Sequence, residues 1–166
     1  MPDSQIAAEL LVARLLRCGR GFLSPYLERE VPEPYLEAMR RGMARLAKGE
    51  PLQYVIGSTP FCGLTFRVDS RVLIPRPETA ELVEWIARDA SSNGSLLDIG
   101  TGSGCIAISL AHILTGWKVQ GWDISDGALE VARLNNIQNG ADVEFCKVDI
   151  LDAPGQDYGF DVIVSN

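Results

Sequence analysis

The stretch LLDIGTGSGCIAISLA, residues 96–111, restricts the possible folds of this chain more than any other part of its sequence. Residues typical of a buried strand run into Gly100, Gly102 and Gly104, and an apolar helix pattern follows directly. Glycine lets the backbone turn sharply and lets a ligand approach, while the first N–H groups of a helix attract carboxylate or phosphate. The stretch therefore predicts a strand, a ligand-binding loop and a helix in immediate succession.

The surrounding sequence repeats this alternation of strands and helices. A helix is predicted at 77–90, and then strands at 96–99, 119–122, 143–148 and 162–164, with helices at 106–114 and 127–139 between them. Strands that alternate with helices form a parallel sheet covered by helices. We therefore expect residues 76–166 to form an α/β, Rossmann-like domain that contains four parallel strands.

The first part of the chain has a different pattern. Helical spacing predicts helices at 4–17 and 33–48, and Ser24-Pro25 has the residue types of a helix start. From residue 52 the period changes, and we expect a β-hairpin in which 64–68 pairs with 71–74. The expected organisation is a helical domain at 1–50, a β-hairpin linker at 51–75 and the α/β domain at 76–166.

Charge is unevenly divided along the chain. Residues 1–50 hold eight basic and seven acidic side chains, whereas the rest holds seven basic and fifteen acidic ones. An acidic main body disfavours a broad phosphate-binding surface, so we expect no direct binding of nucleic acid. A basic cluster lies on the predicted helix at 33–48, where it forms either a solvated face, which we favour, or a docking surface: Arg40, Arg41, Arg45 and Lys48. The same helix carries a stripe predicted to pack: Leu36, Met39, Met43 and Leu46.

The sequence shows neither the pattern of a metal site nor that of a membrane-spanning segment. The four cysteines lie more than 40 residues apart and His112 is the only histidine, which disfavours a zinc site. We expect buried, reduced thiols and a structural role for His112. No signal peptide pattern opens the chain and no apolar stretch is long enough to span a bilayer, so we expect a cytoplasmic protein.

The spacing of the glycines selects among nucleotide ligands. A dinucleotide site needs G-x-G-x-x-G, but the sixth position from Gly100 is Cys105, and no G-K-[ST] follows the loop. The second strand ends at Asp123, where a carboxylate can accept both hydroxyls of a ribose. A nucleoside with an amino-acid tail fits this pattern, and S-adenosylmethionine is such a molecule. Asp98 either faces the ammonium group of this cofactor or fixes the loop by hydrogen bonds. Ile150 either forms an apolar wall beside the adenine or packs into the core.

Three segments together resemble a known family. Residues 49–86 (GEPLQYVIGSTPFCGLTFRVDSRVLIPRPETAELVEWI), the glycine stretch and the terminal Ser165-Asn166 are similar to the HemK/PrmC peptide chain release factor glutamine methyltransferases. The resemblance implies an N-terminal domain that helps hold the release factor and a domain that uses S-adenosylmethionine as cofactor. The expected cofactor-binding residues are Gly100, Thr101, Gly102, Ser103, Gly104, Asp123, Ile150 and Asn166.

Asn166 matches the first residue of the family's Asn-Pro-Pro-Tyr corner, which implies a catalytic and substrate-binding role. Its side-chain oxygen would accept from the glutamine amide of a Gly-Gly-Gln motif and stabilise charge that develops on the nitrogen. Pro-Pro-Tyr does not follow here, so we expect the 166-residue chain alone to be inactive. Two alternatives stay open: an adenine amino-methyltransferase acting on nucleic acid, and an inactive binding fragment.

Overall fold

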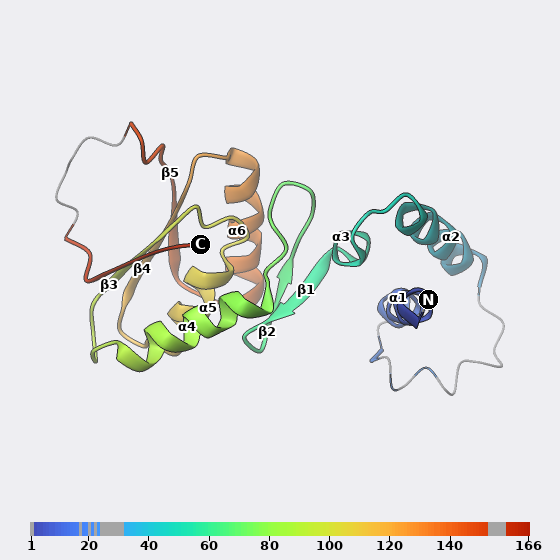
Figure 1. The fold of residues 1–166 in the computed structure, drawn as a ribbon, viewed down its shortest axis with the longest axis horizontal. Coiled ribbons are helices and arrows are strands. Elements are labelled where there is room, and N and C mark those ends of the chain that lie inside the picture. Colours follow the sequence, from blue (N-terminus) through green and yellow to red (C-terminus); the bar gives the residue numbers. More distant parts are fainter. Residues whose placement is uncertain (1, 17, 20, 22, 24–31, 153–158) are drawn as a thin grey trace. The chain divides into compact units, whose positions relative to one another are not determined.

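The computed structural model describes residues 2–16, 18–19, 21, 23, 32–152 and 159–166 (Figure 1). The chain divides into two compact units, Met1–Gly57 and Ser58–Asn166, each of which is described by itself. The division falls at Gly57, whereas we had expected boundaries after residues 50 and 75. The expected helix start at Ser24-Pro25 lies outside the described residues.

The first unit is helical, as predicted. It contains α1 (Pro2–Leu15), α2 (Glu33–Ala47) and the short α3 (Leu52–Ile56). Gly42 on α2 allows close packing against α1, because a Cβ there would lie 2.6 Å from Leu11 Cδ2. Met43, which we placed in the packing stripe, is exposed, and its neighbour Gly42 takes the buried position. The stripe was wrong at this position because glycine offers no hydrophobic signal.

The basic cluster on α2 is engaged in ion pairs. Each of its arginines pairs with a glutamate of the same unit: Arg40 with Glu33, Arg41 with Glu37, and Arg45 with Glu50. Exposed pairs of this kind contribute at most about 1 kcal/mol each. The pairs agree with a solvated face and leave the three guanidinium groups already partnered.

The hairpin uses other strands than the sequence suggested. Strand β1 (Ser58–Phe61) pairs antiparallel with β2 (Leu64–Arg67), and Phe61 lies opposite Leu64. Cys62 and Gly63 form the two-residue turn with φ values of 45° and 77°, as tight hairpins require. The predicted pairing of 64–68 with 71–74 was wrong, because Asp69 accepts from the backbone N–H of Arg71 at 3.0 Å and turns the chain.

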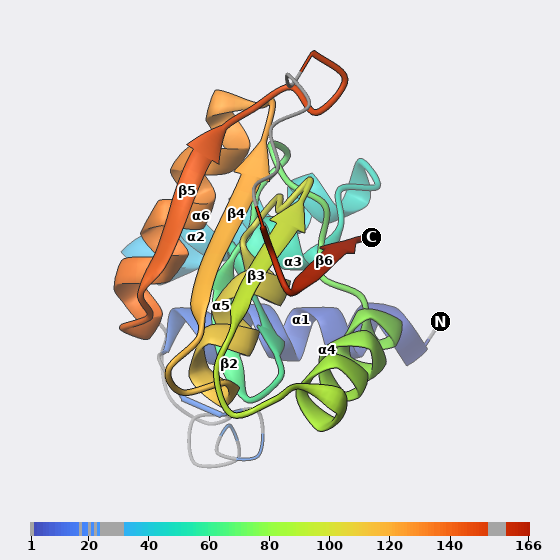
Figure 2. The same cartoon turned by 90° about the vertical axis from the view of Figure 1, so that its left-hand side faces the viewer.

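The rest of the second unit confirms the predicted α/β fold. Its elements are α4 (Pro77–Asp89), β3 (Ser95–Ile99), α5 (Cys105–Ile113), β4 (Lys118–Asp123), α6 (Asp126–Asn139), β5 (Val143–Lys147) and β6 (Val162–Ser165). The four strands of the sheet run parallel in the order β5-β4-β3-β6 (Figure 2). The chain therefore moves away from β3 in one direction and returns on its other side. Such a reversal opens a crevice at the carboxyl end of the first strand.

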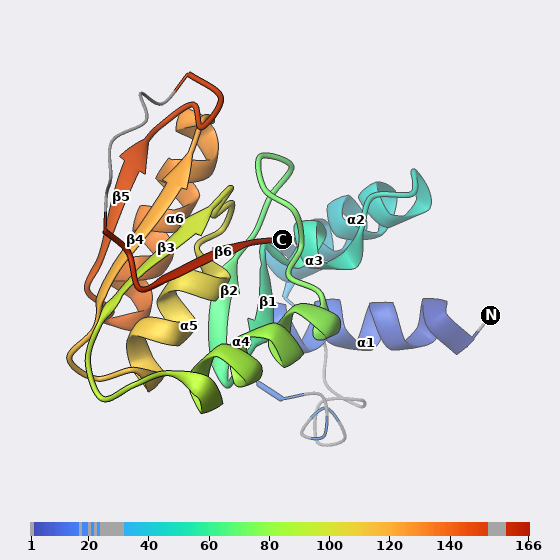
Figure 3. The ribbon, with the colours of Figure 1, turned by 60° about the vertical axis from the view of Figure 1, so that its left-hand side comes forward.

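Helices α5 and α6 cover the same face of this sheet (Figure 3). Residues Cys105–Leu110 of α5 are all buried, which explains a helix that is apolar on every side. Buried thiols had been expected at all four cysteines, but only Cys105 is buried and the others are half-buried in loops and strand edges. His112 Nε2 lies 2.8 Å from the carbonyl oxygen of Asn139 and so links α5 to α6. Among the described residues no helix is long and apolar enough to cross a membrane.

Candidate functional site

The glycine loop begins where β3 ends and is shaped by its backbone. Gly100, Gly102 and Gly104 have φ values of 72°, 55° and 78°. A Cβ on Gly104 would lie 3.0 Å from both Ile108 Cδ1 and Phe145 Cζ, so a side chain there would disturb the core. At Gly102 the nearest atom to such a Cβ is a backbone oxygen at 3.8 Å. The loop is therefore packed against core side chains at Gly104, whereas there is open space next to Gly102, where a ligand can approach.

Asp123 stands at the carboxyl end of β4 and touches this loop. Its Oδ2 accepts from the N–H of Gly102 at 2.9 Å, and its Oδ1 accepts from the N–H of Ser125 at 2.9 Å. Each carboxylate oxygen has a second lone pair and can accept another hydrogen bond. Asp123 therefore holds the loop in place and keeps acceptor capacity for hydroxyl groups.

A pocket of about 270 Å³ opens beside Asp123 at the carboxyl ends of β3, β4 and β5. It brings together three residues that the sequence had singled out: Gly100, Asp123 and Ile150. Its remaining lining is mostly apolar: Ile99, Trp122, Ile124, Val148, Asp149 and Leu151. Apolar walls with a few converging polar groups are typical of small-molecule sites. We had not singled out Ile124 and Leu151 from the sequence. The available signal was an apolar residue shortly after the acid that ends a strand: Ile124 follows Asp123, and Leu151 follows Asp149-Ile150.

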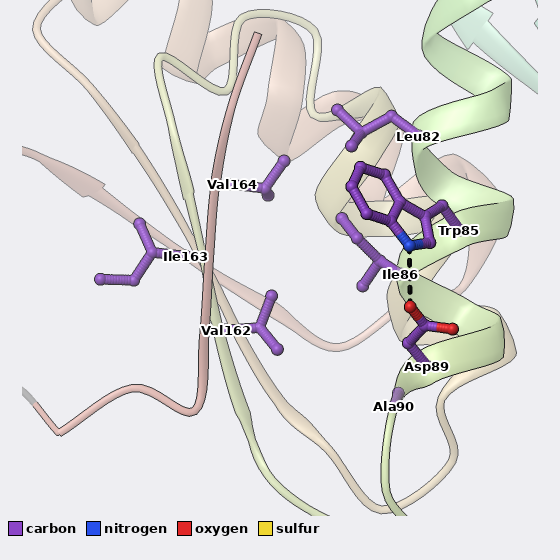
Figure 4. A pocket seen from close by; sticks show the side chains of 8 residues that line it. All are labelled: Leu82, Trp85, Ile86, Asp89, Ala90, Val162, Ile163 and Val164. Atoms are coloured by element: carbon purple, nitrogen blue, oxygen red, sulfur yellow. Dashed lines mark hydrogen bonds between the residues drawn. The ribbon is translucent and has the colours of Figure 1, made fainter.

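A second pocket, of about 310 Å³, lies between α4 and β6. Figure 4 shows Leu82, Trp85 and Ile86 projecting from α4 towards Val162 and Val164, while Ile163 points away. Its one charged group, Asp89, already accepts from Trp85 Nε1 at 2.7 Å. Without converging polar groups, this pocket is a poorer candidate for a cofactor site than the one at Asp123.

Two predicted loop side chains point inward. Thr101 and Ser103 are both buried, and Thr101 donates from its hydroxyl to Asp98 Oδ2 at 2.7 Å. These two residues offer a ligand their backbone rather than their side chains. The Thr101 bond supports the interpretation of Asp98 as a residue that fixes the loop.

The carboxyl group of Asp98 lies beneath this loop and is almost fully buried. Burial raises the pKa of Asp98 to about 7, although hydrogen bonds from the Thr101 hydroxyl and the Ala107 backbone oppose the rise. The nearby Asp123 carboxylate raises the pKa of Asp98 further. A cation bound in the loop would favour the ionised form of this group.

Asn166 follows β6 at the other side of the loop. Ser165 pairs with Ile99, the last residue of β3, so Asn166 comes directly after the last paired position of β6. Asn166 Nδ2 donates to Thr79 Oγ1 at 2.8 Å, a partner in the first turn of α4 that the sequence did not reveal. Asn166 does not line the pocket at Asp123.

Comparison with known proteins addresses both units. Residues 1–57 match the family profile described as the PrmC N-terminal domain, and residues 90–166 match one described as a methyltransferase domain. A release factor glutamine methyltransferase of Koribacter versatilis is 42% identical over 99% of this chain and 60% of its own length. That of Bacteroides thetaiotaomicron is 54% identical over 74% of this chain and 44% of its own length. The chain belongs to the HemK/PrmC family.

Family membership fits the division of the fold, since the PrmC N-terminal match and the first compact unit both end at residue 57. Solved structures support the fold of the second unit. A Pyrococcus abyssi tRNA (uracil-54, C5)-methyltransferase in complex with S-adenosyl-L-homocysteine covers 64% of this chain and 27% of its own, with a TM-score of 0.54 and 26% identity. Human methyltransferase 10 domain containing protein covers 63% of this chain and 53% of its own, with a TM-score of 0.51 and 26% identity.

Stability of this HemK/PrmC chain should fall as pH rises towards 7, owing to Asp98. Its pKa is about 7 in the fold, far above the ordinary value for an aspartate, so the folded state holds a proton that the unfolded chain releases. The stabilisation is complete below about pH 4 and is lost as pH rises through 7. We expect a decrease of about 2–3 kcal/mol in unfolding free energy between pH 5 and 8.

Urea unfolding at several pH values measures this slope, and Asp98→Asn provides the comparison, because its amide cannot ionise. The variant should be nearly flat over the same range. Parallel curves for the two proteins would show that Asp98 is ionised throughout.

Proposed function

We propose that this chain contributes the cofactor site and one catalytic residue of a release factor glutamine methyltransferase. The chain spans between 44% and 60% of the length of the first two curated relatives. The observation that carries it is the contact of Asp123 with the N–H of Gly102, beside a largely apolar pocket. An acid, a bare glycine backbone and an apolar wall suit a ribose, an amino-acid tail and an adenine, respectively.

The residues of the site fit S-adenosylmethionine, and each part has a task. Asp123 would accept from the ribose hydroxyls, and Ile124 and Ile150 would flank the base within the pocket. Gly100 and Gly102 would leave room for the amino-acid tail above the loop. When bound, the cofactor supplies an electrophilic methyl group on a sulfonium.

Asn166 is the proposed acceptor on the substrate side, and the glutamine of a Gly-Gly-Gln motif in a release factor is the proposed substrate. The lone pair of an amide nitrogen is delocalised, so this nitrogen is a weak nucleophile. The Nδ2 of Asn166 is bonded to Thr79, which leaves its Oδ1 as the acceptor. This oxygen would accept from the glutamine N–H and so orient the glutamine nitrogen. Positive charge that develops on the nitrogen is stabilised by this acceptor until a proton leaves.

Calorimetric titration with S-adenosylmethionine, and with NAD as a comparison ligand, tests the cofactor assignment. We expect saturable binding of the first and none of the second. Methyl transfer to a release factor by a protein of the relatives' length, located by mass spectrometry of the Gly-Gly-Gln peptide, tests the reaction. A methyl group found on nucleic acid instead would favour the adenine alternative.

Asp123→Ala should weaken binding of S-adenosylmethionine at least about tenfold. Each lost hydrogen bond to a charged group contributes roughly 1.5–3 kcal/mol at most, and tenfold corresponds to about 1.4 kcal/mol. The loop also loses its anchor at Gly102. Calorimetry measures the affinity.

Asp126→Ala is the matched control, because it removes an acid three residues further along whose partner is Lys147 rather than the loop. It should bind within about twofold of the parent. Equal affinities for the parent and Asp123→Ala would remove the ribose assignment.

A further inference from the structure

A run of amide side chains near the end of α6 has no part in the proposed function. Its central member is Asn135, whose side chain has no exposed surface. Asn135 Oδ1 accepts from the backbone N–H of Arg67 at 2.7 Å, and its Nδ2 donates to the carbonyl of Arg67 at 3.1 Å. The same Nδ2 donates to the carbonyl of Ser103 at 2.8 Å. One buried amide therefore joins the hairpin to the glycine loop.

Two other amides of this run also bond to the hairpin. Gln138 Nε2 and Asn139 Nδ2 both donate to the carbonyl of Thr65, at 2.7 and 3.1 Å. Together with Asn135 they form hydrogen bonds with the backbone of Thr65 and Arg67, on the edge of β2 that faces away from β1. These side chains take the place of a third strand. Of these three amides, Asn135 is the one with a hydrogen bond to the loop.

The bond to Ser103 controls a particular peptide plane. The carbonyl of Ser103 and the N–H of Gly104 belong to the same planar unit. That N–H donates to the carbonyl of Thr101 at 2.8 Å, while Asn135 holds the carbonyl on the other side. The plane is thus held at both ends, and one of the two residues that orient it is Gly104, whose backbone would otherwise rotate freely. Its direction determines where the loop presents Gly102 to a ligand.

We propose that Asn135 is a positioning residue that locks the cofactor loop in its binding shape and ties it to the hairpin. The identity of the ligand rests on the proposed function. The hairpin follows α3 directly through Gly57, so the residue that shapes the loop also holds the segment that leads from the first unit. Removal of the Asn135 amide should loosen the loop as well as β2, whereas removal of Gln138 should loosen β2 alone.

The test compares Asn135→Ala with Gln138→Ala and with Val131→Ala, a buried apolar truncation on the same helix. Amide hydrogen exchange is measured without ligand, and affinity for S-adenosylmethionine is measured by calorimetry below the melting temperatures of all variants. We expect Asn135→Ala to speed exchange at Gly104 at least about tenfold and to weaken binding at least about fivefold. Gln138→Ala should speed exchange in β2 only. Asn135→Leu keeps the volume of the side chain if the alanine variant fails to fold.

A purely structural role predicts a different pattern, in which Val131→Ala loosens the loop and weakens binding as much as an Asn135 variant of equal stability. That result, or unchanged exchange at Gly104 in Asn135→Ala, would overturn the proposal. If the parent chain does not bind S-adenosylmethionine, the proposed function fails, and exchange at Gly104 without ligand still decides the role of Asn135.

Discussion

Gly102→Val is expected to abolish measurable binding of S-adenosylmethionine while the fold survives. The φ of Gly102 is 55°, a region that a β-branched residue adopts only at a cost of roughly 1–3 kcal/mol. The open space above this glycine is where we place the amino-acid tail, and a valine side chain would fill it. The N–H that meets Asp123 would also shift. We expect a loss of at least about a hundredfold in affinity, or about 2.7 kcal/mol.

The chain offers a matched control in Gly140. Its φ is 63°, nothing lies within 4 Å of a Cβ placed there, and it caps the carboxyl end of α6 away from the loop. Gly140→Val should therefore carry similar backbone strain and bind the cofactor normally. Calorimetry gives both affinities and thermal unfolding confirms both folds. Normal binding by Gly102→Val would mean that the cofactor does not lie against this loop.

Asn166→Ala is expected to reduce methyl transfer at least about a hundredfold, well beyond any weakening of cofactor binding. Catalysis here depends on holding a weak nucleophile in line, and a displacement of about 1 Å can lower the rate roughly a hundredfold. Loss of the Asn166 oxygen removes both this orientation and an acceptor for the developing charge. Initial rates with a release factor measure the effect.

The assay needs a protein of the relatives' length, for example this chain joined to the part of the Koribacter versatilis relative that it does not match. Ser165→Ala is the control, because this neighbour donates from its hydroxyl to the carbonyl of Ile99 and has no proposed contact with substrate. It should retain activity within about threefold. If Asn166→Ala transferred methyl groups as fast as the parent, the acceptor role would be wrong.

Patterns confined to a few neighbouring residues carried most of the correct predictions. The apolar run before Gly100 and the acid after the second strand depend on hydrophobic period and turn residues, which act locally. Gly100, Asp123 and Ile150 line one pocket, because the carboxyl ends of parallel strands meet at one edge of a sheet. Family resemblance rested on equally local stretches, such as PLQYVIG and LIPRPET.

Contacts between distant residues were beyond such patterns. Residues 72–74 form an apolar run that is typical of a strand, yet Asp69 turns the chain before them and β2 pairs with the preceding β1 instead. Asn135 looks like a poor helix former until Arg67 and Ser103 are seen around it, 68 and 32 residues away. Thr79 meets Asn166 across 87 residues. The sequence by itself determined the order of strand, loop and helix and the placing of an acid at the end of the second strand. The tertiary structure alone decided which edge each strand exposes and which buried amide satisfies it, because a polar group's partner depends on which segments pack together.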